Sequence, residues 1–249
     1  MLLHLSTWAE VEAYLKRSTG IVIPIGSTEQ HGPNGLVGTD AICAEVFGHA
    51  MGRAGDILVG PTVAVGMAQH HLAFPGSMTL RPSTLIAVLR DMVASLSRHG
   101  FERIFFVNGH GGNVATVTAA FSEIYAEASL QAGSGNGTPV RCTIKNWYDM
   151  PAARRLSKEL FGSEEGTHAT PSEVSVTFHA YPEAVKQAEL TPRVAPWGSF
   201  ADAADYRRKF PDGRIGSNPA LASAEHGRRI VEAVTPELVD SYRSFLATA

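Results

Sequence analysis

The chain contains little cysteine and no long apolar run. Its 249 residues include only two cysteines, Cys43 and Cys142, which are far apart rather than in a C-x-x-C pair. Both lie in apolar stretches, so the sequence predicts two buried free thiols in a reducing compartment. No stretch approaches the roughly 18 apolar residues of a membrane span, and the N-terminus lacks the basic and apolar segments of a signal peptide. We therefore expect a cytoplasmic protein that does not contact a membrane.

The chain also lacks a strong excess of charge of either sign. The formal net charge is −3, and the sequence has neither a basic stripe nor an acidic tail. Nucleic-acid binding therefore has no electrostatic support and is not expected. Charged residues make up only 18% of the chain and hydrophobic residues 44%. This composition fits two alternatives equally well: a large core, or a surface that partner subunits cover in a homo-oligomer.

Two common types of catalytic motif are missing. Ser27 does not lie in a G-x-S-x-G elbow, which argues against a serine hydrolase. The glycine-rich turn at 108–113 matches neither G-x-x-x-x-G-K-[ST] nor G-x-G-x-x-G. A turn of this kind before a helix could still hold a phosphate. It contains no basic residue, so a phosphate-binding transferase is the weaker alternative.

Apolar runs alternate with amphipathic segments along the chain. Short β-branched runs predict strands, and apolar positions at helical spacing predict helices, with Ser6 capping the first of them. The expected strands are 20–26, 57–61 with 63–65, 103–107 and 140–147. The expected helices are 7–17, 41–51, 84–99, 114–130, 172–180 and one or two over 219–246. We expect irregular structure at 72–80, 133–137 and 190–218. This alternation predicts a single α/β domain over 1–249, with helices on both faces of a parallel sheet.

Polar side chains gather after two of the expected strands. Glu29 and His31 follow the first strand, Asp40 comes later at the start of a helix, and His110 follows the strand at 103–107. Because the carboxyl ends of parallel strands meet at one edge of a sheet, we expect these side chains to lie close together. Carboxylate and imidazole groups suit Zn²⁺ or Mn²⁺, and one aspartate could bridge two ions.

Each of these residues also has an ordinary structural interpretation. Asp40 could be a helix N-cap, His110 a hydrogen-bonded loop residue and Glu29 an exposed loop acid. His71, with His70 beside it, could line the pocket or belong to a polar loop. Spacing alone leaves the metal site and these alternatives open.

Several segments resemble the creatininase (creatinine amidohydrolase) family. The matching segments are 25–33 (IGSTEQHGP), 38–40 (GTD), 71–76 (HLAFPG) and 107–113 (VNGHGGN), with weaker matches at 166–173 and 216–227. The resemblance covers nearly the whole chain. It implies a three-layer αβα sandwich with a mostly parallel central sheet. It also implies a homo-oligomer, which is a hexamer in the enzyme that names the family.

The resemblance implies a site with two divalent metal ions, Zn²⁺ or Mn²⁺ or both, with Fe²⁺ as a further candidate. It carries four metal ligands over to this chain, with the aspartate as the bridge: Glu29, His31, Asp40 and His110. The family enzyme has a glutamate as a further ligand where this chain has Gly112. We expect Glu173 to supply the fifth ligand instead. The alternative for Glu173 is an acid that stabilises a helix N-terminus.

His168 matches the family's catalytic histidine, whose natural role is to protonate the leaving nitrogen. Together with Glu173 it forms the expected catalytic set. Four residues are expected to contact substrate: Gly111 and Gly112 through backbone N–H groups, Trp147 by stacking on a flat group, and His71 by lining the pocket. The alternative for Trp147 is a core aromatic at a strand end.

The sequence thus predicts a divalent-metal-dependent amidohydrolase that cleaves the C–N bond of a small cyclic or linear amide with a metal-bridged water. Within the family's range the candidates are creatinine hydrolysis, deformylation of a formamide and removal of a peptide from a redox-cofactor precursor. An alternative from another class is a non-catalytic, metal-binding scaffold protein. Retention of all the expected ligands and of His168 favours the enzyme.

Overall fold

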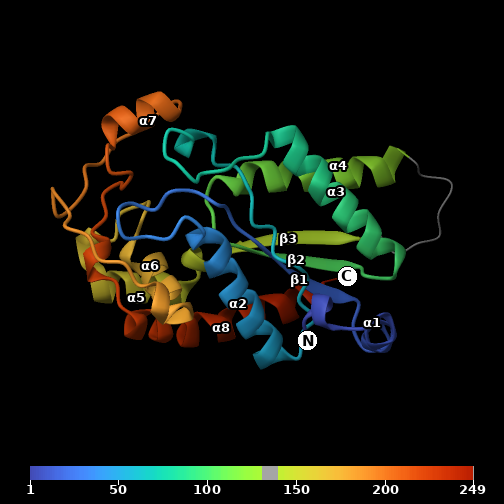
Figure 1. Cartoon of the computed structure of the whole chain (residues 1–249). Coiled ribbons are helices and arrows are strands. Elements are labelled where there is room, and N and C mark those ends of the chain that lie inside the picture. The colour runs from blue at the N-terminus through green and yellow to red at the C-terminus, as the bar shows by residue number, and fades with distance from the viewer. Residues whose placement is uncertain (131–139, 249) are drawn as a thin grey trace.

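The centre of the protein is a sheet of parallel strands. The computed structural model describes residues 1–130 and 140–248. Its sheet has three strands in the order β1 (Gly20–Ile25), β2 (Arg103–Asn108) and β3 (Arg141–Asn146). Residues Ile25, Asn108 and Asn146 pair across the sheet, so the strands end level with one another. The loops that follow them leave from one edge of the sheet (Figure 1).

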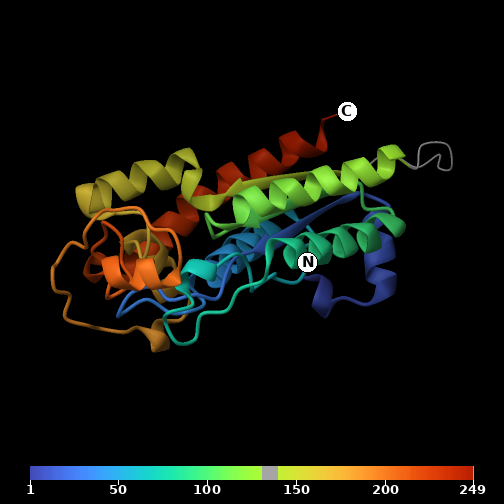
Figure 2. The same cartoon turned by 90° about the horizontal axis from the view of Figure 1, so that it is seen from above.

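Helices cover both faces of this sheet, as Figures 1 and 2 show. One face carries α3 (Pro82–Arg98) and α4 (Asn113–Leu130), and the core on the other face is built with α2 (Thr39–Gly55), α5 (Pro151–Phe161), α6 (Pro171–Ala180) and α8 (Ala224–Leu246). Side chains of β2 alternate between the two cores: Phe105 points to the α2 and α8 side, and Phe106 to the α3 and α4 side. This arrangement confirms the expected αβα class.

The expected strand after α2 forms isolated bridges instead of a continuous ladder. Val59 bridges Val22 and Val63 bridges Ile25, both in parallel. Pro61 lies between the two bridges and has no N–H to donate, so pairing is interrupted there. The prediction of a strand was therefore wrong, although the segment does run beside β1.

The first long helix begins one residue later than expected. α1 (Trp8–Leu15) is capped by Thr7 rather than Ser6. The Thr7 hydroxyl accepts the Glu10 N–H, and the Glu10 carboxylate accepts the Thr7 N–H at 2.7 Å. This reciprocal capping box satisfies two donors at the helix start, which explains why Thr7 is the better cap.

Two helices were not expected. α5 follows β3 after the short 3-10 helix Trp147–Asp149, and α7 (Ala203–Lys209) lies inside the segment 190–218 that was predicted to be irregular. α7 is only seven residues long and begins after the N-cap Asp202, so few residues carry a helical sequence pattern there. The C-terminal segment is one helix, α8, despite Pro236 within it. Short 3-10 helices occupy Leu3–Leu5, Gln69–His71, Trp147–Asp149, Gly162–Glu164, Pro182–Ala184 and Pro219–Leu221.

Both cysteines are free, as predicted. Cys43 is buried in α2, but Cys142 on β3 is only half-buried, because β3 is the edge strand of the sheet. The expected surface turn at 133–137 lies outside the described residues. Within the described part of the chain, no helix is both long and apolar enough to cross a membrane.

Candidate functional site

Three segments bring acidic and imidazole side chains to the carboxyl edge of the sheet. Glu29 and His31 lie in the loop after β1, Asp40 is the second residue of α2, and His110 follows β2. All four are buried, Glu29 completely. The packing is tight, because a Cβ on Gly109 would lie 2.1 Å from the Asp40 carbonyl oxygen. Glycine there lets the loop after β2 meet the start of α2.

Asp40 is the centre of this group. Its Oδ1 lies 3.1 Å from His31 Nε2, and its Oδ2 lies 3.0 Å from His110 Nδ1. Gly38, not Asp40, is the N-cap of α2. The interpretation of Asp40 as a helix cap is therefore wrong. Its two carboxylate oxygens face two different histidines, which is the geometry that a bridging ligand requires.

The two histidines beside Asp40 are oriented by backbone carbonyl groups. His31 Nδ1 lies 3.1 Å from the Glu29 carbonyl oxygen, and His110 Nε2 lies 2.9 Å from the Met67 carbonyl oxygen. If each of these nitrogens donates its hydrogen to the carbonyl, the other ring nitrogen of each histidine faces Asp40. Histidine ligands of metals are commonly held in this way.

Glu29 is a buried carboxylate that lies between two histidines. Its Oε1 lies 3.1 Å from His71 Nε2, and its Oε2 lies 3.3 Å from His110 Nε2. Among the described residues, however, neither oxygen has a partner with hydrogen-bond geometry, and the same holds for Asp40 Oδ2. Burying carboxylate oxygens without partners is costly, so their chemistry fits a bound cation. Glu29 is not the exposed loop acid of the alternative interpretation.

Glu173 joins the same group from α6. Its Oε1 lies 3.8 Å from His31 Nε2 and accepts the Thr170 N–H at 2.6 Å. Both interpretations of Glu173 therefore describe part of its environment: it closes the capping box of α6, and its carboxylate also reaches the cluster.

Two sets of side chains in this cluster could each hold a metal ion and share Asp40. One set is Glu29, Asp40 and His110; the other is His31, Asp40 and Glu173. In each set the ligand atoms lie within 4.8 Å of one another. Further sets combine Glu29 with His31 and His168, or with His70 and His71.

The buried charges shift the pKa values of the cluster strongly. Burial opposes the charged form of His31, but Asp40 and Glu173 outweigh it and raise its pKa to about 10. For the same reason Glu29 and Asp40 raise the pKa of His110 to about 9 despite its burial. Burial and the charge of Asp40 raise the pKa of Glu29 to about 7, and burial raises that of Glu173 to about 7. Burial also acts on Asp40, but the two histidines hold its pKa well below the usual range.

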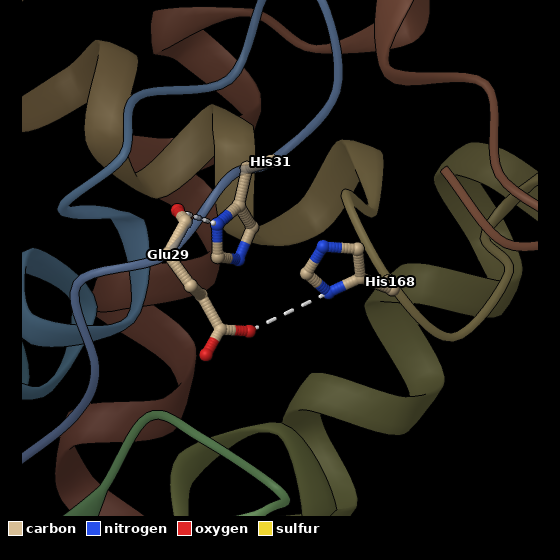
Figure 3. A group of neighbouring side chains, drawn as sticks. All are labelled: Glu29, His31 and His168. Carbon is tan, nitrogen blue, oxygen red and sulfur yellow. Dashed lines mark hydrogen bonds and ion pairs between the residues drawn. The ribbon is translucent and has the colours of Figure 1, made fainter. Parts of the chain in front are cut away.

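His168 faces the cluster from the opposite side, as Figure 3 shows with Glu29 and His31. His168 Nε2 lies 2.8 Å from the Gln30 carbonyl oxygen and 2.9 Å from Gln30 Nε2. If Nε2 donates to the carbonyl oxygen, Nδ1, which is 3.9 Å from Glu29 Oε1, carries no proton. Burial and the nearby His71 and His31 lower the pKa of His168 well below its ordinary value. His168 is therefore neutral, and in this tautomer its free nitrogen faces the cluster.

Gln30 fixes the tautomer of His71. The two amide hydrogens of Gln30 go to the Gly213 carbonyl oxygen and to His71 Nδ1, each at 2.9 Å. His71 Nε2 then carries the hydrogen and lies 3.1 Å from Glu29 Oε1, although not with hydrogen-bond geometry. Burial lowers the pKa of His71 to about 2, so this histidine is a neutral donor and not a free ligand nitrogen.

A cavity of about 630 Å³ opens over the cluster. Its lining includes Gly111, Gly112, His71 and Trp147. Neither glycine N–H donates a hydrogen bond within the described part of the chain. Trp147 is only 1% exposed and stacks on Phe47 with ring centroids 4.9 Å apart, so most of it belongs to the core and only an edge reaches the cavity.

Several lining residues were missed by the sequence analysis: Tyr148, Glu165, Phe200 and Tyr206. Phe200 stacks on His70 with ring centroids 4.8 Å apart, and Tyr206 contacts His71 edge-on at 4.6 Å. These residues come from α7, from the segment before it, from the 3-10 helix after β3 and from the α5–α6 connection. Nothing in their local sequence separates them from ordinary core or surface residues. Only Tyr148, directly after Trp147 at a strand end, carried a positional signal.

Comparisons with known proteins agree with this geometry. The family model described as "Creatininase: Creatinine amidohydrolase" matches residues 4–242. A mycofactocin precursor peptide peptidase of Mycolicibacterium smegmatis is 30% identical over 224 residues, 84% of this chain and 78% of that protein. A 3-dehydro-scyllo-inosose hydrolase of Thermotoga maritima is 25% identical over 96% of this chain and 82% of that protein. A solved manganese form of creatininase superposes with a TM-score of 0.80 at 23% identity, covering 99% of both chains.

The match to the family model spans almost all of the chain, and the matched relative from Mycolicibacterium smegmatis is covered over more than two thirds of its length. Members of the family are amidohydrolases that act on carbon–nitrogen bonds. The chain belongs to the creatininase family and is an enzyme of this class.

Proposed function

We propose that this enzyme depends on two divalent metal ions and hydrolyses the C–N bond of a small amide with a water held between them. One observation carries the proposal: Asp40 presents one carboxylate oxygen to His31 at 3.1 Å and the other to His110 at 3.0 Å. With Glu29 on one side and Glu173 on the other, these residues form two candidate ligand sets that share Asp40.

The donor set suits Zn²⁺ or Mn²⁺, with Fe²⁺ as a further candidate, because it combines carboxylate oxygens with imidazole nitrogens. When bound, such ions polarise the substrate carbonyl and lower the pKa of a water. Glu29, His31, Asp40, His110 and Glu173 would hold them. Creatininase itself has been solved in a manganese form and as a zinc–zinc form of a mutant.

His168 moves the proton in this reaction. It is neutral, and its Nδ1 faces the cluster while its Nε2–H is held by the Gln30 carbonyl oxygen. Nδ1 takes the proton from the attacking water as the new C–O bond forms. It then gives that proton to the nitrogen as the C–N bond breaks, so His168 ends the cycle neutral.

The backbone of the turn after β2 binds the substrate. The N–H groups of Gly111 and Gly112 donate no hydrogen bond within the described residues and lie at the cavity wall. We propose that they donate to the substrate beside the scissile carbonyl. His71 lines the same wall and holds Glu29 in place, while the edge of Trp147 contacts a flat part of the substrate.

The cavity of about 630 Å³ leaves room for more than a creatinine molecule. Creatinine therefore stays one candidate substrate, beside formamides and short peptides. The 30% identical relative is a precursor peptide peptidase, which supports including peptides in any substrate test.

The proposal is tested by metal analysis of the purified protein together with a panel of amides. The panel contains creatinine, N-formyl amines and dipeptides, each assayed with added Mn²⁺ or Zn²⁺ and after chelation. We expect two ions per chain and metal-dependent release of an amine from at least one compound. A protein that binds no metal and hydrolyses no compound would contradict the proposal. Bound metal without any turnover would favour the alternative, a non-catalytic metal-binding scaffold.

The fifth ligand has its own test. Glu173→Ala is expected to lose one of the two ions, whereas His179→Ala, an exposed change on the same helix, should keep both. Two ions at full occupancy in Glu173→Ala would remove Glu173 from the ligand set. Circular dichroism checks that each variant is folded.

We also propose that the chain forms a homo-oligomer, as the low charge content allows. Leu5 and Trp8 near the N-terminus are 75% and 80% exposed, which suits a surface covered by a partner subunit. Light scattering of the intact protein tests this directly, and a monomer would contradict both the oligomer and the hexamer that the family resemblance implies.

A further inference from the structure

Glu165 is a buried carboxylate that the proposed reaction does not use. It follows the 3-10 helix Gly162–Glu164 and lines the cavity. Its Oε2 is buried without a hydrogen-bond partner, and Glu165 forms no ion pair among the described residues. Burial raises the pKa of Glu165 to about 7. The Ser157 hydroxyl acts against this shift. Keeping such a group inside the protein still costs stability, so its one hydrogen-bond contact among the described residues needs an explanation.

That contact is a hydrogen bond from Ser172, whose hydroxyl donates to Glu165 Oε1. A serine hydroxyl has one hydrogen, so Ser172 can only accept in its other contact, the 3.1 Å approach of Thr170 Oγ1. Thr170 therefore donates to Ser172. Its free lone pair accepts the Glu173 N–H at 3.2 Å. Glu165 thus sets the direction of every hydroxyl in this chain of hydrogen bonds.

The chain ends at the metal-binding cluster. Thr170 is the N-cap of α6, and its own N–H holds Glu173 Oε1 at 2.6 Å. The same Oε1 is 3.8 Å from His31 Nε2. We propose that Glu165 is a positioning residue that acts through Ser172 and Thr170 to aim the Glu173 carboxylate at the ion shared with Asp40. The inference rests on the proposed function, because it takes Glu173 to be a ligand.

The physical reason is that the hydroxyl groups of Ser172 and Thr170 lose their fixed orientation when the acceptor, Glu165 Oε1, is removed. Without Glu165 Oε1, the Ser172 hydroxyl can donate to Thr170 Oγ1 instead. The Thr170 hydroxyl hydrogen must then turn away from Ser172, and it competes with the Glu173 N–H on the other side of Thr170 Oγ1. The capping box of α6 loosens, and the carboxylate of Glu173 is held less firmly. Hydrogen-bond partners that orient a metal ligand commonly change metal affinity by about 10- to 100-fold.

The test compares Glu165→Leu, which removes the acceptor, with Glu165→Gln, which keeps an acceptor oxygen for Ser172. Glu159→Leu serves as the control, because Glu159 is an exposed acid on α5 whose ion-pair partner among the described residues is Arg229. Binding of Mn²⁺ to each chelator-treated protein is measured by titration calorimetry, and thermal unfolding is followed beside it. We expect Glu165→Leu to bind one of two Mn²⁺ ions at least tenfold more weakly. Glu165→Gln and Glu159→Leu should bind both within threefold of the unchanged protein.

Ser172→Ala breaks the same chain at its next link and keeps the test valid if Glu165→Leu folds poorly. The double variant should lose no more Mn²⁺ affinity than either single variant, because the two changes remove one shared interaction. A lower melting temperature with unchanged Mn²⁺ affinity in Glu165→Leu and Ser172→Ala would overturn the proposal and leave Glu165 a purely structural group. If Glu173→Ala keeps both ions, the ligand assignment fails; if it loses one while Glu165→Leu keeps both, only the role of Glu165 fails.

Discussion

Metal binding by this protein should release protons, because the proposed ligand nitrogens of His31 and His110 carry protons when no metal is bound. His31 Nε2 and His110 Nδ1 lie 3.1 and 3.0 Å from the two oxygens of Asp40. The negative cluster raises their pKa values to about 10 and about 9. A divalent ion can bind only to the neutral imidazole, so each ion must displace a proton from the nitrogen that it occupies.

The number of protons follows from these values. At pH 7.5 both imidazoles are almost fully protonated, and Glu29 and Glu173, each with a pKa of about 7, are only partly protonated. Full loading should therefore release at least about two protons per chain at this pH, those of the two imidazoles. At pH 9.5 the carboxyl groups hold none and His110 holds little, so the release should fall to roughly one proton.

Calorimetric titration of chelator-treated protein with Mn²⁺ in buffers of different ionisation enthalpy measures this number. His110→Gln should lower it by about one proton at pH 7.5. His71→Gln is the control, because His71 is already neutral, with a pKa of about 2, and should leave the number unchanged. Release of less than one proton at pH 7.5 would refute the reasoning, since it would mean that neither histidine carries a proton in the place that the ion takes.

The same protons set the stability of the metal-free protein. Both histidines have folded-state pKa values above the ordinary 6.5, so their stabilising contribution is complete below pH 6.5 and is lost as the pH rises through 9 and 10. Glu29 and Glu173 act in the same direction between pH 4.5 and 7, because their pKa values are also raised. The melting temperature of the chelated protein should therefore fall from pH 7 to pH 10. An increase over that range would contradict the assignment of these charges.

Three further changes test the site and its support. Gly112→Ala should weaken metal binding, because a Cβ there would lie 2.4 Å from His110 Nε2. Gly111→Ala is the control and should bind metal normally, because nothing would lie nearer than 3.5 Å to its Cβ. Metal analysis of the two variants decides this. His168→Asn should keep both ions and lower kcat by about 100- to 10,000-fold, measured on whichever amide is hydrolysed; an unchanged kcat would exclude His168 as the proton carrier. Trp147→Ala should cost about 3–5 kcal/mol of unfolding free energy, measured by denaturant titration, because the side chain is buried in the core; a cost below 1 kcal/mol would show that packing tolerates its loss.

The sequence was most informative where candidate metal ligands directly follow a predicted strand. Glu29 and His31 follow β1, and His110 follows β2, so their meeting required only that the strands be parallel. Asp40 joins them because the loop after β1 leads straight back to the edge of the sheet at the start of α2. Local rules were sufficient here: strand ends fix where a side chain begins, and parallel pairing fixes which ends are neighbours.

Local rules failed where pairing or packing depends on distant residues. The segment around Val59 has the composition of a strand, but its partners and the proline beside it leave only isolated bridges. α7 is short, and its Tyr206 is fully buried against the site through contacts that no local pattern encodes. The capping box of α6 could be read from Thr170 and Glu173, yet the sequence could not tell that the same carboxylate reaches His31.

The two parts of the site therefore have different origins. The groups around Asp40 lie at strand ends and helix starts, where the backbone holds them in place. The opposite wall, with Tyr148, Glu165 and Phe200, is formed by the end of β3, the α5–α6 connection and the segment before α7. A change in that wall alters the space and hydrogen bonds offered to a substrate while the carboxylates and histidines around Asp40 keep their backbone supports. Glu165 is the exception that links the two parts, because its hydrogen bonds run from the wall through α6 to a residue of the cluster. Substitutions there should therefore affect metal binding as well as substrate choice, whereas a change at Phe200 should affect substrate choice alone.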